Sequence, residues 1–128
     1  MHELDSGFAL IAPRQLRIKR IYDAPARSDG FRLLVDRLWP RGISKKRAML
    51  SGWMPDLAPS AELRKWFGHD PERWSEFRRR YWTELAGKQS LINSIRDRLL
   101  EERVTLLYAA RDATCNQAQV LKQFIEAA

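Results

Sequence analysis

Two short apolar runs, separated by a long stretch of helical periodicity, dominate the hydrophobic pattern of this chain. They cover residues 31–35 and 104–110. Because each run is short and rich in Leu or Val, both are typical of strands buried on both faces, as in a parallel sheet. A third segment, residues 16–22, alternates apolar with basic side chains, which predicts a half-exposed first strand.

Helices are expected between the two apolar runs and again at the C-terminus. Ser60 can cap the first helix, which ends at Gly68, and Asp70 can cap the second. The third helix is expected over residues 90–102 and the last over about 115–127. In each, apolar residues recur at three- and four-residue spacing, which is typical of a helix with one face in the core.

The connecting segments are rich in turn-forming residues. Residues 23–30 contain Pro, Ser, Asp and Gly and are too few for a crossover helix, which needs at least about 10–12 residues. The first two strands are therefore joined either by a wide hairpin or by a loop over one edge of the sheet. Residues 42–57 are expected to form a loop with a short helix or strand.

These elements predict an α/β fold, with a small, mostly parallel β-sheet flanked by about four α-helices in a three-layer-like arrangement. The chain has 128 residues, an ordinary length for one domain. Residues 1–15 are expected to form a flexible tail and residues 16–128 the single domain. The tail has an apolar patch at residues 8–12, but Glu3 and Asp5 stand where a signal peptide would be basic.

The net charge and the cysteine content indicate which ligands and which cellular compartment to expect. The formal net charge of +7 at pH 7 favours attraction to polyanions or to small anionic ligands. No apolar stretch approaches the roughly 18 residues that cross a membrane, and the single cysteine, Cys115, cannot form an intramolecular disulfide. We therefore expect a cytoplasmic protein with no membrane partner and no cofactor. A metal site is not expected, since His2, His69 and Cys115 lack ligand-like spacing.

The first candidate site follows the apolar run at residues 31–35, which leads directly into Asp36, Arg37, Trp39 and Arg41. Open α/β sheets commonly bind ligands at the carboxyl ends of their strands. Arginine offers a fork that suits carboxylate or phosphate, and tryptophan offers a stacking surface. One interpretation is an anion pocket with an aromatic wall. The structural alternative is an ion pair of Asp36 with Arg37 or Arg41, with Trp39 in the core.

A second polar cluster follows the last strand. Asp112, Thr114 and Asn116 lie where the final helix is expected to begin, and free backbone N–H groups at such a position favour an anion. Thr114 and Asn116 are also expected to act as caps. Cys115 is interpreted as a packing residue or a reactive thiol. A phosphatase-type loop is not expected, because Leu121 stands six residues later in place of Arg.

A third cluster contains His69 with Asp70 and Arg64. A histidine just beyond a helix end can act as a general base or as a donor to an anion, or it can simply pack and hold the turn. The sequence does not identify a catalytic residue. The candidates are Asp36, His69 and Cys115.

Five segments occur together in a distinctive order: SDG (28–30), LVDRLWPRG (34–42), LAPSAELRKWFGHDP (57–71), RYWTEL (80–85) and TLLYAARD…NQAQVL (105–121). Together they resemble the YeaO-like branch of a bacterial and archaeal family labelled as a domain of unknown function. The resemblance covers the chain from about residue 16 to its end. It implies a compact, cytoplasmic α/β protein but no particular activity.

One departure from the wider family bears on chemistry. More distant relatives carry a Cys-His-Arg triplet after the last strand, and the comparable positions here are Cys115, Asn116 and Gln117. The cysteine is kept and the other two are not, which puts any chemistry that needs the triplet in doubt. Some relatives carry transcriptional-regulator labels, but this sequence shows no helix-turn-helix with a basic recognition helix.

Three functions remain open from the sequence. The leading hypothesis is a site for a small anionic or phosphate-bearing ligand at the ends of both buried strands, made of Asp36, Arg37, Trp39, Arg41, Asp112, Thr114 and Asn116. The alternative is a nucleic-acid-associated basic protein, with a regulatory role left open. The third is an interaction module with an exposed apolar face such as residues 8–12. Neither the oligomeric state nor the ligand follows from the sequence.

Overall fold

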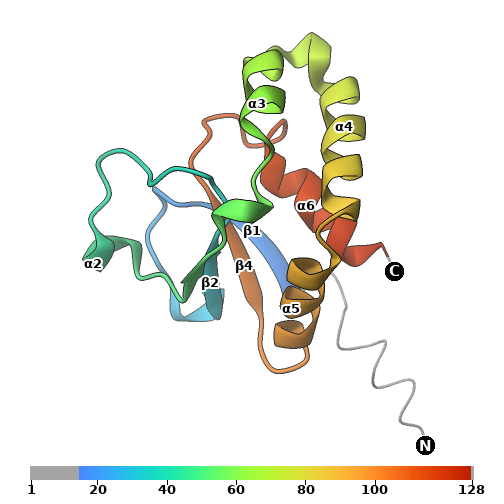
Figure 1. Cartoon of the computed structure of the whole chain (residues 1–128). Helices are drawn as coiled ribbons and strands as arrows, with labels where there is room; N and C mark the ends of the chain where they lie inside the picture. Colours follow the sequence, from blue (N-terminus) through green and yellow to red (C-terminus); the bar gives the residue numbers. More distant parts are fainter. Residues whose placement is uncertain (1–14, 128) are drawn as a thin grey trace, which may run out of the picture.

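A sheet of four parallel strands lies at the centre of the computed structural model, which describes residues 15–127 (Figure 1). The strands are β1 (Leu16–Arg20), β2 (Phe31–Leu34), β3 (Gly52–Trp53) and β4 (Val104–Tyr108). Their order is β1-β4-β2-β3, and every pairing is parallel. The expected tail lies outside the described residues, except for Gln15.

The wide hairpin considered for the first two strands is wrong. β1 and β2 both pair in parallel with β4, so they run in the same direction with β4 between them. The connection from residue 21 to residue 30 must therefore return to the amino end of the sheet. It does so without an α-helix, through a short 3-10 turn at Arg27–Asp29, which agrees with the small number of residues available.

The α-helices are α2 (Lys45–Ala48), α3 (Ala61–Phe67), α4 (Trp74–Ala86), α5 (Gln89–Leu99) and α6 (Gln117–Glu126). Two further 3-10 turns cover Pro55–Leu57 and Pro71–Arg73. The expected small α/β fold is confirmed, and the loop expected over residues 42–57 contains both a short helix and a short strand. Ser60 caps α3 by accepting from the Leu63 N–H, and Gly68 ends that helix at φ 54°.

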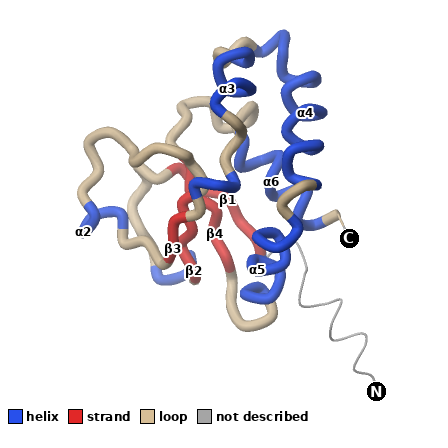
Figure 2. Tube along the Cα trace, in the orientation of Figure 1, coloured by secondary structure: helices blue, strands red, loops and turns tan. Residues whose placement is uncertain are grey.

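The two faces of the sheet are covered differently (Figure 2). Helices α3 to α6 pack on one face, where the strands contribute alternate residues to the main core. These residues are Leu16, Leu33, Val35, Val104, Leu106 and Tyr108. The opposite face carries Leu34 and Leu107 and is covered by the connections that hold Ile21, Ile43 and Ala48. The third layer of the fold is therefore built mainly of loops.

A buried charge cluster holds the loop layer against the sheet. Arg32 donates from Nη1 to Asp29 Oδ2 at 2.6 Å and from Nη2 to the Ala48 carbonyl at 2.8 Å. Lys19 pairs with the other oxygen of Asp29 at 3.1 Å, and Thr105 donates to the Asp29 backbone carbonyl at 2.7 Å. Because each buried charge has partners, this cluster is structural.

Gly30 allows the first connection to enter β2. Its φ is 65°, and a Cβ at this position would lie 2.3 Å from the Arg103 carbonyl oxygen. A side chain would therefore be strained and would also clash with backbone. Within the part of the chain that the structure describes, no helix has both the length and the apolar character required to cross a membrane.

Candidate functional site

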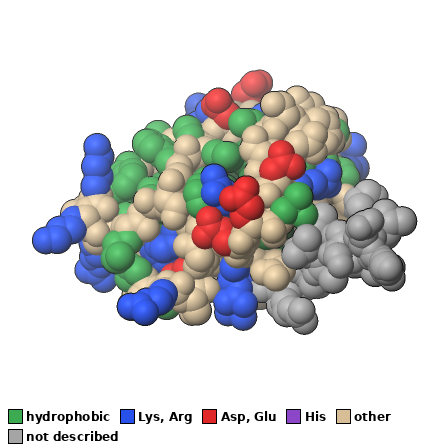
Figure 3. All heavy atoms as spheres, turned by 90° about the horizontal axis from the view of Figure 1, so that it is seen from below, with side chains coloured by type: hydrophobic (Ala, Val, Ile, Leu, Met, Phe, Trp, Pro, Cys, Tyr) green, Lys and Arg blue, Asp and Glu red, His purple; other side chains and the backbone are tan. Residues whose placement is uncertain are grey.

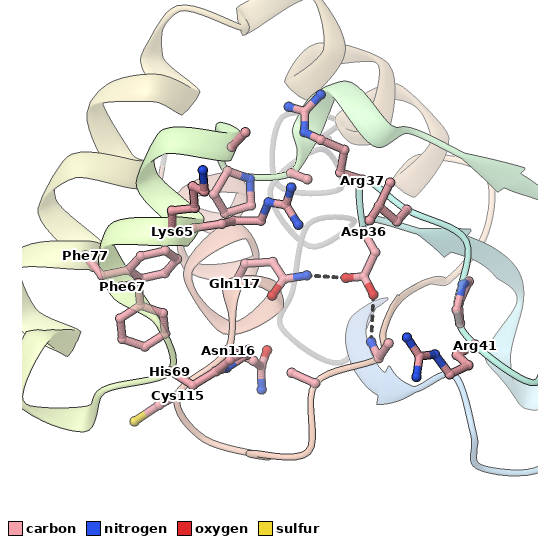
Figure 4. A pocket seen from close by; sticks show the side chains of 18 of the residues that line it. Asp36, Arg37, Arg41, Lys65, Phe67, His69, Phe77, Cys115, Asn116 and Gln117 are labelled. Atoms are coloured by element: carbon pink, nitrogen blue, oxygen red, sulfur yellow. Dashed lines mark hydrogen bonds between the residues drawn. The ribbon is translucent and has the colours of Figure 1, made fainter.

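A cavity of about 790 Å³ opens at the carboxyl edge of the sheet (Figure 4). Its walls come from residues 36–41 after β2, residues 109–117 after β4, and α3 with its flanking residues. The two strand ends are adjacent because β2 pairs directly with β4, and the Val35 N–H continues the ladder to the Leu107 carbonyl at 3.1 Å. The fold thus brings together two segments that lie about 70 residues apart in the sequence.

The third wall is held in place from α4. The Tyr81 hydroxyl, which is fully buried, donates to the Leu57 carbonyl at 2.5 Å. Glu84 accepts from both the backbone N–H and the hydroxyl of Ser60, at 2.9 and 2.6 Å. These bonds position the segment that leads into α3, and α3 then presents Arg64 and Lys65 to the cavity.

Asp36 connects the two strand ends at the cavity wall. Its Oδ2 accepts from the Ala109 N–H at 2.9 Å, and its Oδ1 accepts from the side-chain amide of Gln117 (Figure 4). The ion pair considered between Asp36 and Arg37 or Arg41 is not present within residues 15–127, so that interpretation is wrong. Asp36 instead holds β2, the end of β4 and the start of α6 together.

Burial raises the pKa of Asp36 to about 6, and the hydrogen bonds from Ala109 and Gln117 and the charge of Arg64 only partly oppose the shift. Removing a carboxylate from water disfavours its charged form unless an opposite charge lies close enough to compensate. The carboxyl group therefore changes charge near pH 6, in a cavity that four cationic side chains also line.

Four cationic side chains line this cavity: Arg37, Arg41, Arg64 and Lys65. Within residues 15–127, no hydrogen bond or ion pair joins any of these side chains to another residue. The Nε atom of Arg37 is buried without a partner. In the view of Figure 4, Lys65 and Arg41 lie on opposite sides of the Asp36–Gln117 pair, with Arg37 above it. The cavity therefore has an excess of positive charge that the protein itself does not neutralise.

Trp39 and Tyr22 form part of the wall near Arg41. The indole N–H of Trp39 donates to the Ile43 carbonyl at 2.6 Å, and its ring meets Trp53 edge-on at 5.6 Å. Trp39 is half-buried, packs against the loop-side core and also lines the cavity. The Tyr22 hydroxyl donates to the Arg41 carbonyl at 2.8 Å and holds that backbone in place.

The loop after β4 is organised by Asp112. Its Oδ1 accepts from the backbone N–H groups of Thr114 and Cys115 and from the Thr114 hydroxyl, each at 2.9 Å. Asn116, which is buried, caps α6 by accepting from the Gln119 N–H at 3.1 Å. The cap expected at Thr114 is wrong, because its hydroxyl bonds to Asp112 and the helix starts after Asn116.

A second cavity, of about 430 Å³, adjoins the first, and Phe67, His69 and Cys115 line both. Asp112 lines the second cavity, whereas Thr114 is exposed and lines neither. His69 has a left-handed backbone, with φ 58°, directly after Gly68. Asp70, its neighbour, caps the turn that leads into α4, as expected, by accepting from the Glu72 N–H at 3.0 Å.

Lys65 and Gln117 line the cavity but were not identified as site residues from the sequence, and Arg64 was considered only beside His69. The signal for Arg64 and Lys65 is a basic last turn in α3, which is also common on solvated helices. Gln117 stood out only as a departure from the relatives. Within residues 15–127, no group of three or more His, Cys, Asp or Glu side chains could hold a metal ion.

The fold and the cavity define a small α/β protein with a cationic site at the carboxyl edge of a parallel sheet. The chain belongs to the family described as the inactive DUF488-N3 subclade, whose model matches residues 15–128. It is 41% identical to YeaO of Escherichia coli strain K12, an uncharacterised protein, over 86% of this chain and 96% of the relative. The resemblance to the YeaO-like family is thereby confirmed.

A second relative is an uncharacterised protein of Mycobacterium tuberculosis strain H37Rv. It is 38% identical over 116 residues, which cover 91% of this chain and 98% of the relative. No solved structure matches the chain.

Proposed function

We propose that this protein binds a small anionic or phosphate-bearing ligand in the cavity at the carboxyl ends of β2 and β4. The proposal rests on four cations that line one cavity and that no hydrogen bond or ion pair within residues 15–127 joins to another residue. Like charges gathered in a partly enclosed space raise each other's energy, and a bound anion relieves that repulsion. Arginine also offers two parallel donors to a carboxylate or a phosphate.

The helix that begins at the cavity adds to the positive potential. Asn116 and Gln117, the cap and first residue of α6, both line the cavity, so the positive end of the helix dipole faces it. Binding without turnover fits the family description, an inactive subclade. Asp36, His69 and Cys115 are accordingly proposed as wall residues that shape the site.

Isothermal titration and thermal-shift measurements with nucleotides, sugar phosphates and dicarboxylates test the proposal. We expect at least one of these anions to bind, and Arg64→Ala and Arg41→Ala to weaken its binding at least tenfold. Arg47→Ala is the matched control, since Arg47 is exposed on α2, lines neither of the two cavities and changes the net charge equally. Equal weakening by all three variants, or no binding across the panel, contradicts the proposal.

Nucleic-acid association is the alternative that the net charge suggests. It has less support than binding of a small anion. On the face seen in Figure 3, several Lys and Arg side chains gather at the left end, and acidic side chains near the centre interrupt the basic surface. A continuous basic stripe is the usual footprint of a protein that follows a nucleic-acid backbone. Oligonucleotide binding with a steep salt dependence that survives Arg64→Ala would favour this alternative.

A further inference from the structure

The two cavities at the carboxyl edge adjoin each other and differ in the chemistry of their walls. They share the wall made by Phe67, His69, Ala109, Ala110 and Cys115. Cationic side chains surround the larger cavity. The smaller cavity is lined beyond the shared wall by Pro71, Arg111 and Asp112, and so carries one charge of each sign.

Asp112 offers an unused acceptor to the smaller cavity. Its Oδ1 receives the three hydrogen bonds of the loop, whereas Oδ2 receives none from residues 15–127. The bonds from Cys115 and Thr114 also lower the pKa of this carboxyl group, which keeps it charged at neutral pH. A charged carboxylate in a cavity is suited to a hydroxyl or amine donor and repels a second anion.

The shared wall includes two aromatic side chains, Phe67 and His69, whose rings are tilted to each other by 51°. Phe67 stacks on Phe77 with ring centroids 4.4 Å apart, and the ring of His69 lies against Phe67 at 6.1 Å. In Figure 4, Phe67, His69 and Cys115 lie together on the side of the view away from Arg41. A flat ring is the group that such a wall accommodates best.

The size of the site also argues against a bare anion. A cavity of about 790 Å³ falls within the range of roughly 300–1,000 Å³ typical of small-molecule sites, even before the adjoining 430 Å³ is included. An inorganic anion held by the cations would leave most of this space and the aromatic wall unused.

We infer that the ligand is a phosphate ester whose organic part is a ring with hydroxyl or amine groups, of the size of a mononucleotide. Its phosphate lies in the larger cavity, which Arg37, Arg41 and Arg64 line. Its ring lies along Phe67 and His69 and directs a donor to Asp112. This inference rests on the proposed function and adds the class of ligand and the role of the second cavity.

Titration of the full chain with orthophosphate, glycerol phosphate, ribose 5-phosphate and adenosine monophosphate tests the inference. We expect affinity to rise at least tenfold from orthophosphate to the ring-bearing esters. Asp112→Asn keeps the Oδ1 acceptor that organises the loop but replaces Oδ2 by a donor. It should weaken binding of the ring-bearing esters at least fivefold and leave orthophosphate binding unchanged.

His69→Asn should also weaken binding of the ring-bearing esters, because it removes the imidazole ring. Asparagine tolerates the left-handed backbone at this position, so the loop should keep its conformation. Asp97→Asn is the matched control, an exposed aspartate on α5 outside both cavities. Equal affinity for orthophosphate and the esters would overturn the inference and leave the proposed function standing. The inference also fails if Asp112→Asn and His69→Asn weaken orthophosphate and esters alike. Binding of none of the four probes would count against both.

Discussion

The arginine beneath the sheet and the arginines at its carboxyl edge have opposite surroundings. Arg32 is 4% exposed and donates to Asp29 and to the carbonyls of Ala48 and Met49. Arg41 and Arg64 line an open cavity, and no hydrogen bond or ion pair within residues 15–127 joins their side chains to another residue. Since a buried charge must be partnered while a charge at a cavity need not be, Arg32 serves the fold and the others remain available to a ligand.

Removal of the Arg32 guanidinium should have the largest effect on stability. Arg32→Met leaves the carboxylate of Asp29 buried with Lys19 and the Ala26 N–H as its remaining partners. Loss of one partner of a buried ion pair typically costs about 3–5 kcal/mol, and the remaining lysine places the expected loss near the lower end, at about 3 kcal/mol. Urea denaturation measures it, with Arg17→Met on the exposed side of β1 as the control. A loss no greater than that of the control would remove the distinction between the two groups of arginines.

Asp36 should have an effect on stability of similar size, but one that depends on pH. Its pKa is about 6 in the folded protein and near 3.8 without the fold, so the native state holds the proton more tightly. Its contribution to stability is therefore complete below pH 3.8 and is lost as pH rises from there through about 6, to a total of about 3 kcal/mol. Asp36→Asn has no such loss.

The difference in unfolding free energy between Asp36→Asn and the wild type isolates this group. Glu76 and Asp29 have lowered pKa values and change stability in the opposite direction over acidic pH, but they are common to both proteins. Between pH 4 and pH 7, the wild type should lose stability relative to Asp36→Asn. A difference that stays constant with pH would show that Asp36 is charged throughout.

Asn116→Ala should cost about 1 kcal/mol, since it removes the N-cap of α6. Thr114→Ala should cost less than half as much, because the Thr114 hydroxyl bonds to Asp112 in an exposed loop and caps no helix. Thermal unfolding of the two variants side by side makes the comparison. The reverse order would place the start of the helix at Thr114.

The smallest effect on stability is expected at the cavity itself. Arg41→Ala and Arg64→Ala should change the unfolding free energy by no more than about 0.5 kcal/mol, the usual range for surface side chains without partners. Denaturation in ligand-free buffer measures the change. A loss above about 1 kcal/mol for either variant would assign that arginine to the fold, as for Arg32, and would weaken the proposed site.

Local patterns predicted much of the secondary structure. Ser60, Gly68 and Asn116 act as the caps and terminator expected of them, because a cap satisfies backbone groups within three or four residues of itself. The apolar runs became β2 and β4 because a sheet buried on both faces requires apolar residues at successive positions. Capping at Thr114 was wrong because Asp112, two residues earlier, competes for the same hydroxyl and N–H groups.

The partners of charged residues were harder to predict. Asp36 was expected beside the arginines next to it in sequence, yet it bonds to Ala109 and Gln117 from the other end of the chain. The sequence likewise contained no sign that Lys19, Asp29 and Arg32 form a buried cluster. Contacts between residues far apart depend on strand order, and a parallel sheet of four strands allows several orders for one pattern of strands.

The sequence by itself determined where the strands and helices form, their polar ends and the net positive charge, because these depend on each residue and its near neighbours. Only the tertiary structure decided that β4 lies beside β2 and that α3 turns Arg64 and Lys65 towards both strand ends. The physical reason is that the cavity is formed where segments from distant parts of the chain pack beside one another. Which surfaces meet is set by packing of the whole chain, and no single segment encodes it.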